Sequence, residues 1–225
     1  MPDWWTEYGN DFLWVGVGVA LLAAYHLYLA IRERREPLST LQGVNRSARR
    51  AWVQVIMADP SLGILGVQTL RNSTMTATFL ASTSVVLVMG VLTLSGQADR
   101  IAESWHASNP LGSRHPILWE LKLLVLLVDL LVAFFSFTLS IRLYNHLGFQ
   151  ISLPRERRPA VIDPERVARH LNRAGAFFSV GMRAYYLAVP LVFWLFAPQL
   201  MAAASLILVI VLYFLDRAPD SDGED

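Results

Sequence analysis

Long apolar segments bounded by charged residues dominate the hydrophobic pattern of this chain. Three of them have the length of a single membrane crossing, which needs ~20 residues. They run from Phe12 to Ile31, from Arg71 to Gln97 and from Leu121 to Ile141. Each segment predicts a transmembrane helix.

The fourth apolar stretch, from Ala184 to Leu215, is too long for one crossing. A continuous helix of this length would extend ~48 Å, whereas the hydrocarbon core is ~30 Å thick. Pro198 divides the region into two segments, Phe177 to Ala197 and Gln199 to Leu215, and a proline inside a helix breaks or kinks it. The pattern favours a helical hairpin over a single tilted or kinked helix. We therefore expect an all-α polytopic membrane helix bundle with about five transmembrane helices, the alternative being four.

Two polar segments, Arg32 to Arg71 and Arg142 to Arg183, contain many more arginines than carboxylates. Such an excess marks cytoplasmic loops, so the N-terminus is expected outside and the C-terminus in the cytoplasm. Within the first segment, Ala51 to Met57 is apolar but too short to span and follows the basic sequence RSARR. This pattern predicts an in-plane helix in the cytoplasmic headgroup region.

Two aspartates followed by proline predict helix starts. Asp59 precedes Pro60, and Asp163 precedes Pro164 and Glu165. Aspartate is a favoured N-cap and proline a favoured first helical residue.

The remaining segments complete the predicted organisation. Ala98 to Glu120 is predicted to be the outer loop, with a short interfacial helix as an option. Residues 1–217 form a single membrane-embedded helical domain, and residues 218–225 a disordered acidic tail.

Composition supports the membrane assignment and excludes several classes of function. Of the 225 residues, 54% are hydrophobic and 16% charged, and the formal net charge is only +1, which offers nucleic acid no overall attraction. The chain contains no cysteine, which excludes disulfides, thiolate catalysis and iron–sulfur clusters. No removable signal peptide is evident at the N-terminus. We expect a multi-pass protein of a bacterial inner membrane.

Hydroxyl and small side chains fill the first half of the second span, although lipid-facing helices favour Leu, Ile and Val. We therefore expect this helix inside the bundle, with other helices around it. A face of polar or small residues recurs along it and is a candidate lining for a water-filled path: Thr69, Asn72, Thr76, Thr83 and Gly90. The alternative is close helix packing through a second series of small residues, Thr74, Thr78 and Ser82.

The third span contains a carboxylate, Asp129, in its interior. Lys122, Asp129 and Ser136 are seven residues apart and share one helical face, which must point into protein or water. Intramembrane carboxylates often mark ion or proton paths. The alternative is a structural role, in which Asp129 bonds to Lys122 or to hydroxyls of the second span such as Ser84 or Thr93.

Histidines and arginines provide weaker candidates. His26 and His146 lie near the predicted inner ends of their spans, but the chain contains no HExxH or CxxCH spacing, so no metal or cofactor is expected. Arg71 and Arg183 lie at the mouths of spans, where a cation attracts anions. The other arginines are explained by topology and by contact with anionic lipid headgroups.

Three strings in the chain resemble the family known as domain of unknown function 599, a family of bacterial and plant membrane proteins. The strings are Arg49-Arg50-Ala51-Trp52, VQTLRNSTMTATFLAST from Val67, and RAYYLAVPLVFWLFAP from Arg183. The resemblance covers nearly the whole chain and implies an architecture, but it carries over no catalytic residue. That family commonly has Gly-Pro at the last break, where this chain has Ala197-Pro198.

The combined features favour a homo-oligomeric channel or small transporter for an ion or a small solute. An accessory subunit that assembles with a larger membrane complex is the alternative. A haem- or metal-binding membrane protein is the third hypothesis. No nucleophile and base pair is recognisable, so we do not expect an enzyme.

Overall fold

The computed structural model describes residues 4–97 and 116–217, which include six α-helices and no strand. Five helices are long and apolar enough to cross a membrane. They are α1 (Trp4–Arg35), α3 (Gly63–Ser95), α5 (Pro116–Ile151), α6 (Pro164–Phe196) and α7 (Pro198–Asp216). The sixth helix, α2 (Leu41–Ala58), lies between α1 and α3, and short 3₁₀ turns occupy Pro37–Ser39, Pro60–Leu62 and Arg155–Arg157. The prediction of an all-α bundle with five spans and one additional helix is confirmed. The predicted outer loop, apart from its last few residues, and the acidic tail lie outside the described residues.

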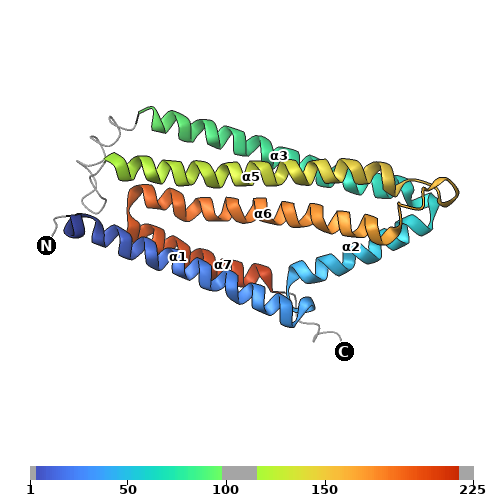
Figure 1. Cartoon of the computed structure of the whole chain (residues 1–225), viewed down its shortest axis with the longest axis horizontal. Helices are drawn as coiled ribbons and strands as arrows, with labels where there is room; N and C mark the ends of the chain where they lie inside the picture. The colour runs from blue at the N-terminus through green and yellow to red at the C-terminus, as the bar shows by residue number, and fades with distance from the viewer. Residues whose placement is uncertain (1–3, 98–115, 218–225) are drawn as a thin grey trace.

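The helices are arranged as a layer, with α5 between α3 and α6, and with α1 packed against α7 (Figure 1). α6 and α7 diverge from their turn, and α2 crosses between their far ends (Figure 1). The start of α1 and the end of α7 lie at opposite ends of the bundle, as an odd number of crossings requires.

The break at Pro198 is a hairpin, as predicted. α6 ends at Phe196 and α7 begins at Pro198, so Ala197 alone makes the turn. Ala197 has φ −160° and ψ 146°, an extended conformation that any residue can adopt. The turn therefore forms without the glycine that the resembling family commonly has there.

Both predicted aspartate caps are present. The Asp163 carboxylate accepts a hydrogen bond of 2.7 Å from the Arg166 amide at the start of α6. The Asp59 carboxylate accepts one of 2.9 Å from the Ser61 amide, and this bond lowers the pKa of Asp59. Each cap satisfies an amide that the helix itself leaves without a partner.

Four of the long helices exceed the thickness of a bilayer, and the extra length of three of them holds α2. α3, α5 and α6 contain 33 to 36 residues, about 50 Å each, against a core of ~30 Å. Val53, Ile56 and Met57 of α2 are buried against the extended ends of these helices. These apolar side chains of α2 are thus covered by protein, and the in-plane position of the helix in the headgroup region stays a prediction.

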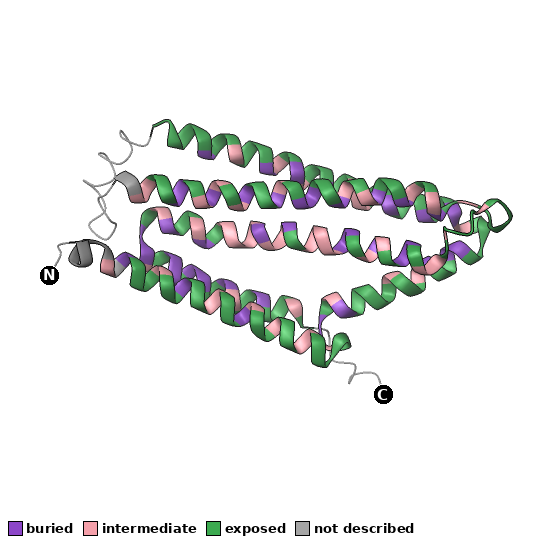
Figure 2. Ribbon diagram, in the orientation of Figure 1, coloured by how far each residue is buried: buried purple, intermediate pink, exposed green. Residues whose placement is uncertain are grey.

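The prediction that other helices surround α3 is wrong for the single chain. α3 lies at one edge of the bundle and packs mainly on α5, and Figure 2 shows most of its surface exposed. The seam against α5 contains Leu70, Ala77, Ser84 and Val91. Each of these residues comes directly after a member of the series that was predicted to line a path. The threonine hydroxyls need no partner from another helix, because each donates to the carbonyl four residues earlier, as Thr76 does to Asn72 at 3.0 Å.

Candidate functional site

A polar cavity of about 420 Å³ lies between α2, α5, α6 and α7, at the end of the bundle where α6 and α7 are furthest apart. Its ionisable side chains are Arg49 from α2, Tyr144 from α5, Arg183 and Tyr186 from α6, and Asp216 from α7. We call it the arginine cavity. In this cavity, chain segments far apart in sequence bring charged groups together.

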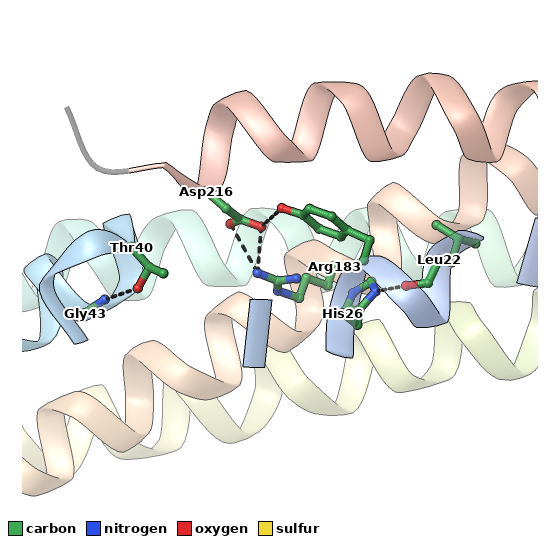
Figure 3. Close-up of polar contacts among 7 residues, drawn as sticks. Leu22, His26, Thr40, Gly43, Arg183 and Asp216 are labelled. Atoms are coloured by element: carbon green, nitrogen blue, oxygen red, sulfur yellow. Dashed lines mark hydrogen bonds and ion pairs between the residues drawn. The ribbon is translucent and has the colours of Figure 1, made fainter. Parts of the chain in front are cut away.

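An ion pair between α6 and α7 lines one side of the arginine cavity. The Nη2 atom of Arg183 lies 3.1 and 3.0 Å from the two carboxylate oxygens of Asp216. The Tyr25 hydroxyl of α1 donates to the same carboxylate at 2.7 Å, and Figure 3 shows Arg183 and Asp216 pointing toward each other. The network joins three helices and uses one nitrogen of the Arg183 guanidinium.

The Arg49 side chain enters the cavity from α2 and is held by α6. Its Nε donates to Asn172 Oδ1 at 2.9 Å, and a Cβ at Gly175 would lie 2.8 Å from its Nη1. A side chain larger than glycine at this position would therefore require the guanidinium to shift. Asn172, Gly175, Ser179 and Arg183 share one face of α6 through their spacing of three or four residues.

Arg49 differs from Arg183 in its ionic contacts within the described part of the chain. Among the residues that the structure describes, no carboxylate forms a salt bridge with it. The side chain is half-buried, and its desolvation lowers the pKa of Arg49. Arginine nevertheless stays charged in proteins, so the cavity contains a cation that no carboxylate of the described residues neutralises through a salt bridge.

Other basic residues hold α2 beside the cavity. Arg46 pairs with Glu33 of α1 at 3.1 Å, and Arg50 pairs with Glu165 of α6 at 2.7 Å. The hydrogen bond to Glu165 raises the pKa of Arg50. Arginines that the sequence assigned to topology and headgroups therefore also form ion pairs between helices.

The start of α2 is attached to the end of α7. Thr40 caps α2 by accepting a hydrogen bond of 3.2 Å from the Gly43 amide, a contact shown in Figure 3. The backbone of Thr40 also pairs with that of Arg217, the residue after Asp216. This attachment places α2 next to the Arg183 and Asp216 ion pair.

The two basic loops lie at the same end of the bundle. The Arg158 guanidinium of the second loop donates to the Met57 carbonyl of α2 at 3.2 Å. This common location agrees with the interpretation that both segments face one side of the membrane.

Asp129 lies elsewhere, in an apolar hollow of about 310 Å³ lined by α1, α5, α6 and α7. Its Oδ2 atom is enclosed and has no hydrogen-bond partner within the described part of the chain. The expected hydroxyl partners are engaged elsewhere: Ser84 bonds with Tyr185 at 2.8 Å, and Thr93 donates to the Met89 carbonyl. The prediction that Asp129 bonds to these hydroxyls is therefore wrong.

The other two residues that share a helical face with Asp129 are buried. One of them, Lys122, lies toward the end of the bundle opposite the arginine cavity. Lys122 is only 3% exposed, and Ser136 is also buried. The Lys122 Nζ lies 5.6 Å from the centre of the Trp194 ring and interacts electrostatically with Asp11. The predicted alternative in which Lys122 bonds to Asp129 is not what the structure contains, since Lys122 contacts Trp194 instead.

The residues predicted to form one polar seam lie in two separate places. Thr69, Asn72 and Thr76 lie on the exposed side of α3, whereas Asp129 lines a hollow on the far side of α5. Arg71 is also exposed on α3 and lies outside the arginine cavity, which contains the other predicted mouth cation, Arg183.

The histidine candidates stay separate from these sites. His26 Nδ1 donates to the Leu22 carbonyl of its own helix at 2.8 Å, and His146 is exposed on α5. Within the described ranges, no group of three or more His, Cys, Asp or Glu side chains is placed to hold a metal ion.

Sequence reasoning missed Arg49 and Asp216 as members of one site. A signal for Asp216 existed in the hairpin prediction. With the turn at Ala197, Arg183 lies 14 residues before it and Asp216 lies 19 residues after it, which places both at the same end of antiparallel helices. Arg49 had no comparable signal, because the position of α2 depends on packing.

The fold and the buried charged groups define a multi-pass α-helical integral membrane protein. A family model described as "Protein of unknown function, DUF599" matches residues 13–221, so the chain belongs to that family, as its resemblance indicated. Neither a curated protein nor a solved structure matched the chain.

Proposed function

We propose that this protein is a small membrane transporter for an anionic solute, and that the arginine cavity is its solute site. The observation that carries the proposal is the half-buried Arg49 guanidinium, which lines the cavity and has no carboxylate partner among the described residues. A desolvated charge without a counterion is unfavourable, and an anion in the cavity removes that cost.

The composition of the cavity suits an anion. Two guanidiniums line it against one carboxylate, which leaves one net positive charge among Arg49, Arg183 and Asp216. Arginine presents a planar set of donors that matches the oxygens of a carboxylate or phosphate. A volume of about 420 Å³ is in the range of sites for small organic ligands.

The proposed role is binding and transport rather than catalysis. In the proposed orientation, the basic loops and the cavity face the cytoplasm of a bacterial cell, and the N-terminus lies outside. A homo-oligomer is part of the proposal, since the exposed polar side of α3 suits contact with a second copy of the chain.

The first experiment measures binding of inorganic phosphate to the purified protein by the shift in its melting temperature. We expect stabilisation of the wild-type chain, its loss in R49Q, and its retention in R71Q, which removes an exposed arginine outside the cavity. Melting without phosphate checks that each variant is folded.

The second experiment measures phosphate uptake by proteoliposomes, with empty vesicles and R49Q as controls. Uptake above that of empty vesicles is expected only for the wild-type chain and R71Q. If phosphate neither stabilises the protein nor enters the vesicles faster than in the controls, the proposal is wrong.

A second candidate function, an assembly subunit of a larger membrane complex, is favoured by the outer side of α3. Thr69, Asn72 and Thr76 are exposed there on a helix that crosses the membrane. Because the chain contains no cysteine, T76C introduces a single thiol. A disulfide-linked dimer would support a second copy at this surface, and a cross-link to another protein would favour the assembly role.

A further inference from the structure

An apolar groove between α6 and α7 adjoins the arginine cavity. It has a volume of about 350 Å³ and is lined by Val189 and Phe193 of α6 and by Ala203 and Ile207 of α7. Tyr186 lines both the groove and the arginine cavity. The polar and apolar spaces therefore meet at one side chain.

The groove has the length of one acyl chain. Along α7 its lining runs from Leu200 to Val211, which is about 16 Å at the rise of an α-helix, or half of a ~30 Å hydrocarbon core. The charged end lies beyond Val211, where Leu212, Leu215 and Asp216 line the arginine cavity. A charged end that continues into half a bilayer thickness of apolar groove matches the shape of a lipid.

We propose that the ligand of the arginine cavity is an anionic phospholipid, with its phosphate beside Arg49 and Arg183 and one acyl chain in the groove between α6 and α7. This inference rests on the proposed anion site and names the class of its ligand. The net positive charge of the cavity favours an anionic headgroup over a zwitterionic one. A free anion with the same headgroup chemistry has no acyl chain to place in the groove, so the groove favours a lipid.

Charge complementarity and continuity decide the occupant of the groove. An exposed apolar face on a membrane helix has no preference among lipids, because all acyl chains are alike to it. Here the groove shares Tyr186 with the arginine cavity, which two guanidiniums line, and one of these guanidiniums has no carboxylate partner in the described residues. Arginine-lined pockets at a membrane surface bind anionic lipid headgroups.

The test compares three probes on the purified full chain in detergent: phosphatidylglycerol, phosphatidylcholine and glycerol 3-phosphate. Native mass spectrometry measures the apparent Kd of each. We expect phosphatidylglycerol to bind at least about tenfold more tightly than either of the others, since it alone combines a net negative headgroup with acyl chains.

Two variants separate the headgroup from the chain. R49Q should weaken phosphatidylglycerol and glycerol 3-phosphate together. A203F places a phenyl ring in the groove from an exposed position, and it should weaken phosphatidylglycerol about tenfold while leaving glycerol 3-phosphate unchanged. A20F, at an exposed position of α1 outside the groove, is the matched control and should change neither.

The outcomes distinguish this inference from the function on which it rests. Equal binding of phosphatidylglycerol and glycerol 3-phosphate, with no effect of A203F, would overturn the lipid assignment and leave the anion site standing. Equal binding of phosphatidylcholine and phosphatidylglycerol would also overturn it. If no anionic probe binds, the lipid assignment and the anion site fail together.

Discussion

Replacing Asp216 by Asn removes the carboxylate that pairs with Arg183 and accepts the Tyr25 hydroxyl. The side chains of Arg183 and Asp216 are 21% and 22% exposed, so the pair lies between a surface salt bridge and a fully buried one. Either single replacement leaves the opposite charge without its partner in a mostly desolvated place. The double replacement leaves no such charge.

These conditions set the expected size of the effect. Removing one partner of a buried ion pair costs ~3–5 kcal/mol, whereas an exposed pair contributes ~0–1 kcal/mol. For this intermediate burial we expect D216N and R183Q each to lower the free energy of unfolding by about 2 kcal/mol. The double variant should also lose about 2 kcal/mol in total, so the coupling energy of the pair is about 2 kcal/mol.

The assay is equilibrium unfolding in mixed micelles with increasing sodium dodecyl sulfate, followed by circular dichroism. Glu33 and Arg46 form a matched control pair between α1 and α2, with side chains 27% and 54% exposed. The cycle of E33Q and R46Q should show a coupling energy below about 0.5 kcal/mol, because exposed pairs are well solvated.

Additive effects would refute this account of the ion pair. If D216N and R183Q sum to the double variant within about 0.5 kcal/mol, the two side chains act independently and the pair does not hold α6 to α7. A coupling as small as that of the control pair would lead to the same conclusion.

Other substitutions test further contacts by the same unfolding assay. G181A should destabilise the protein by about 1–3 kcal/mol, since its Cβ would lie 2.7 Å from the fully buried Phe137 ring; G16A, with open space around it, should not. D163A should cost about 1 kcal/mol through loss of the α6 cap, and D163N should retain most of it. D129L should stabilise the protein by about 1–2 kcal/mol, because the Asp129 Oδ2 atom is enclosed without a hydrogen-bond partner among the described residues. A loss of stability would indicate that Asp129 makes an interaction that this geometry lacks.

The elements that local sequence predicts were found where expected. The spans depend on apolar length, the Asp163 cap on one side chain and its neighbouring amides, and the Pro198 break on a missing backbone donor. Each of these features acts within a few residues or one helix, so it can be recognised without knowing which helix lies beside it.

Predictions that required a neighbour were less successful. The hydroxyl-rich composition of α3 suggested burial, but a threonine that donates to its own helix carries no information about what surrounds it. A bond from Asp129 to hydroxyls of α3 was one alternative, whereas the hollow that it lines is formed with α1, α6 and α7. Helical spacing identified the shared face of Asp129 and Lys122 but could not say which helix that face meets.

By itself, the sequence determined that this protein is a helical membrane protein with five spans, a turn at Pro198 and two basic segments, because hydrophobicity, proline and charge act along the chain. Only the tertiary structure decided that Arg49, Arg183 and Asp216 share a cavity. These residues come from α2, α6 and α7, and their meeting depends on how α2 packs against the extended ends of the other helices. Such packing reflects the combined burial of many side chains, which no single segment of the chain specifies.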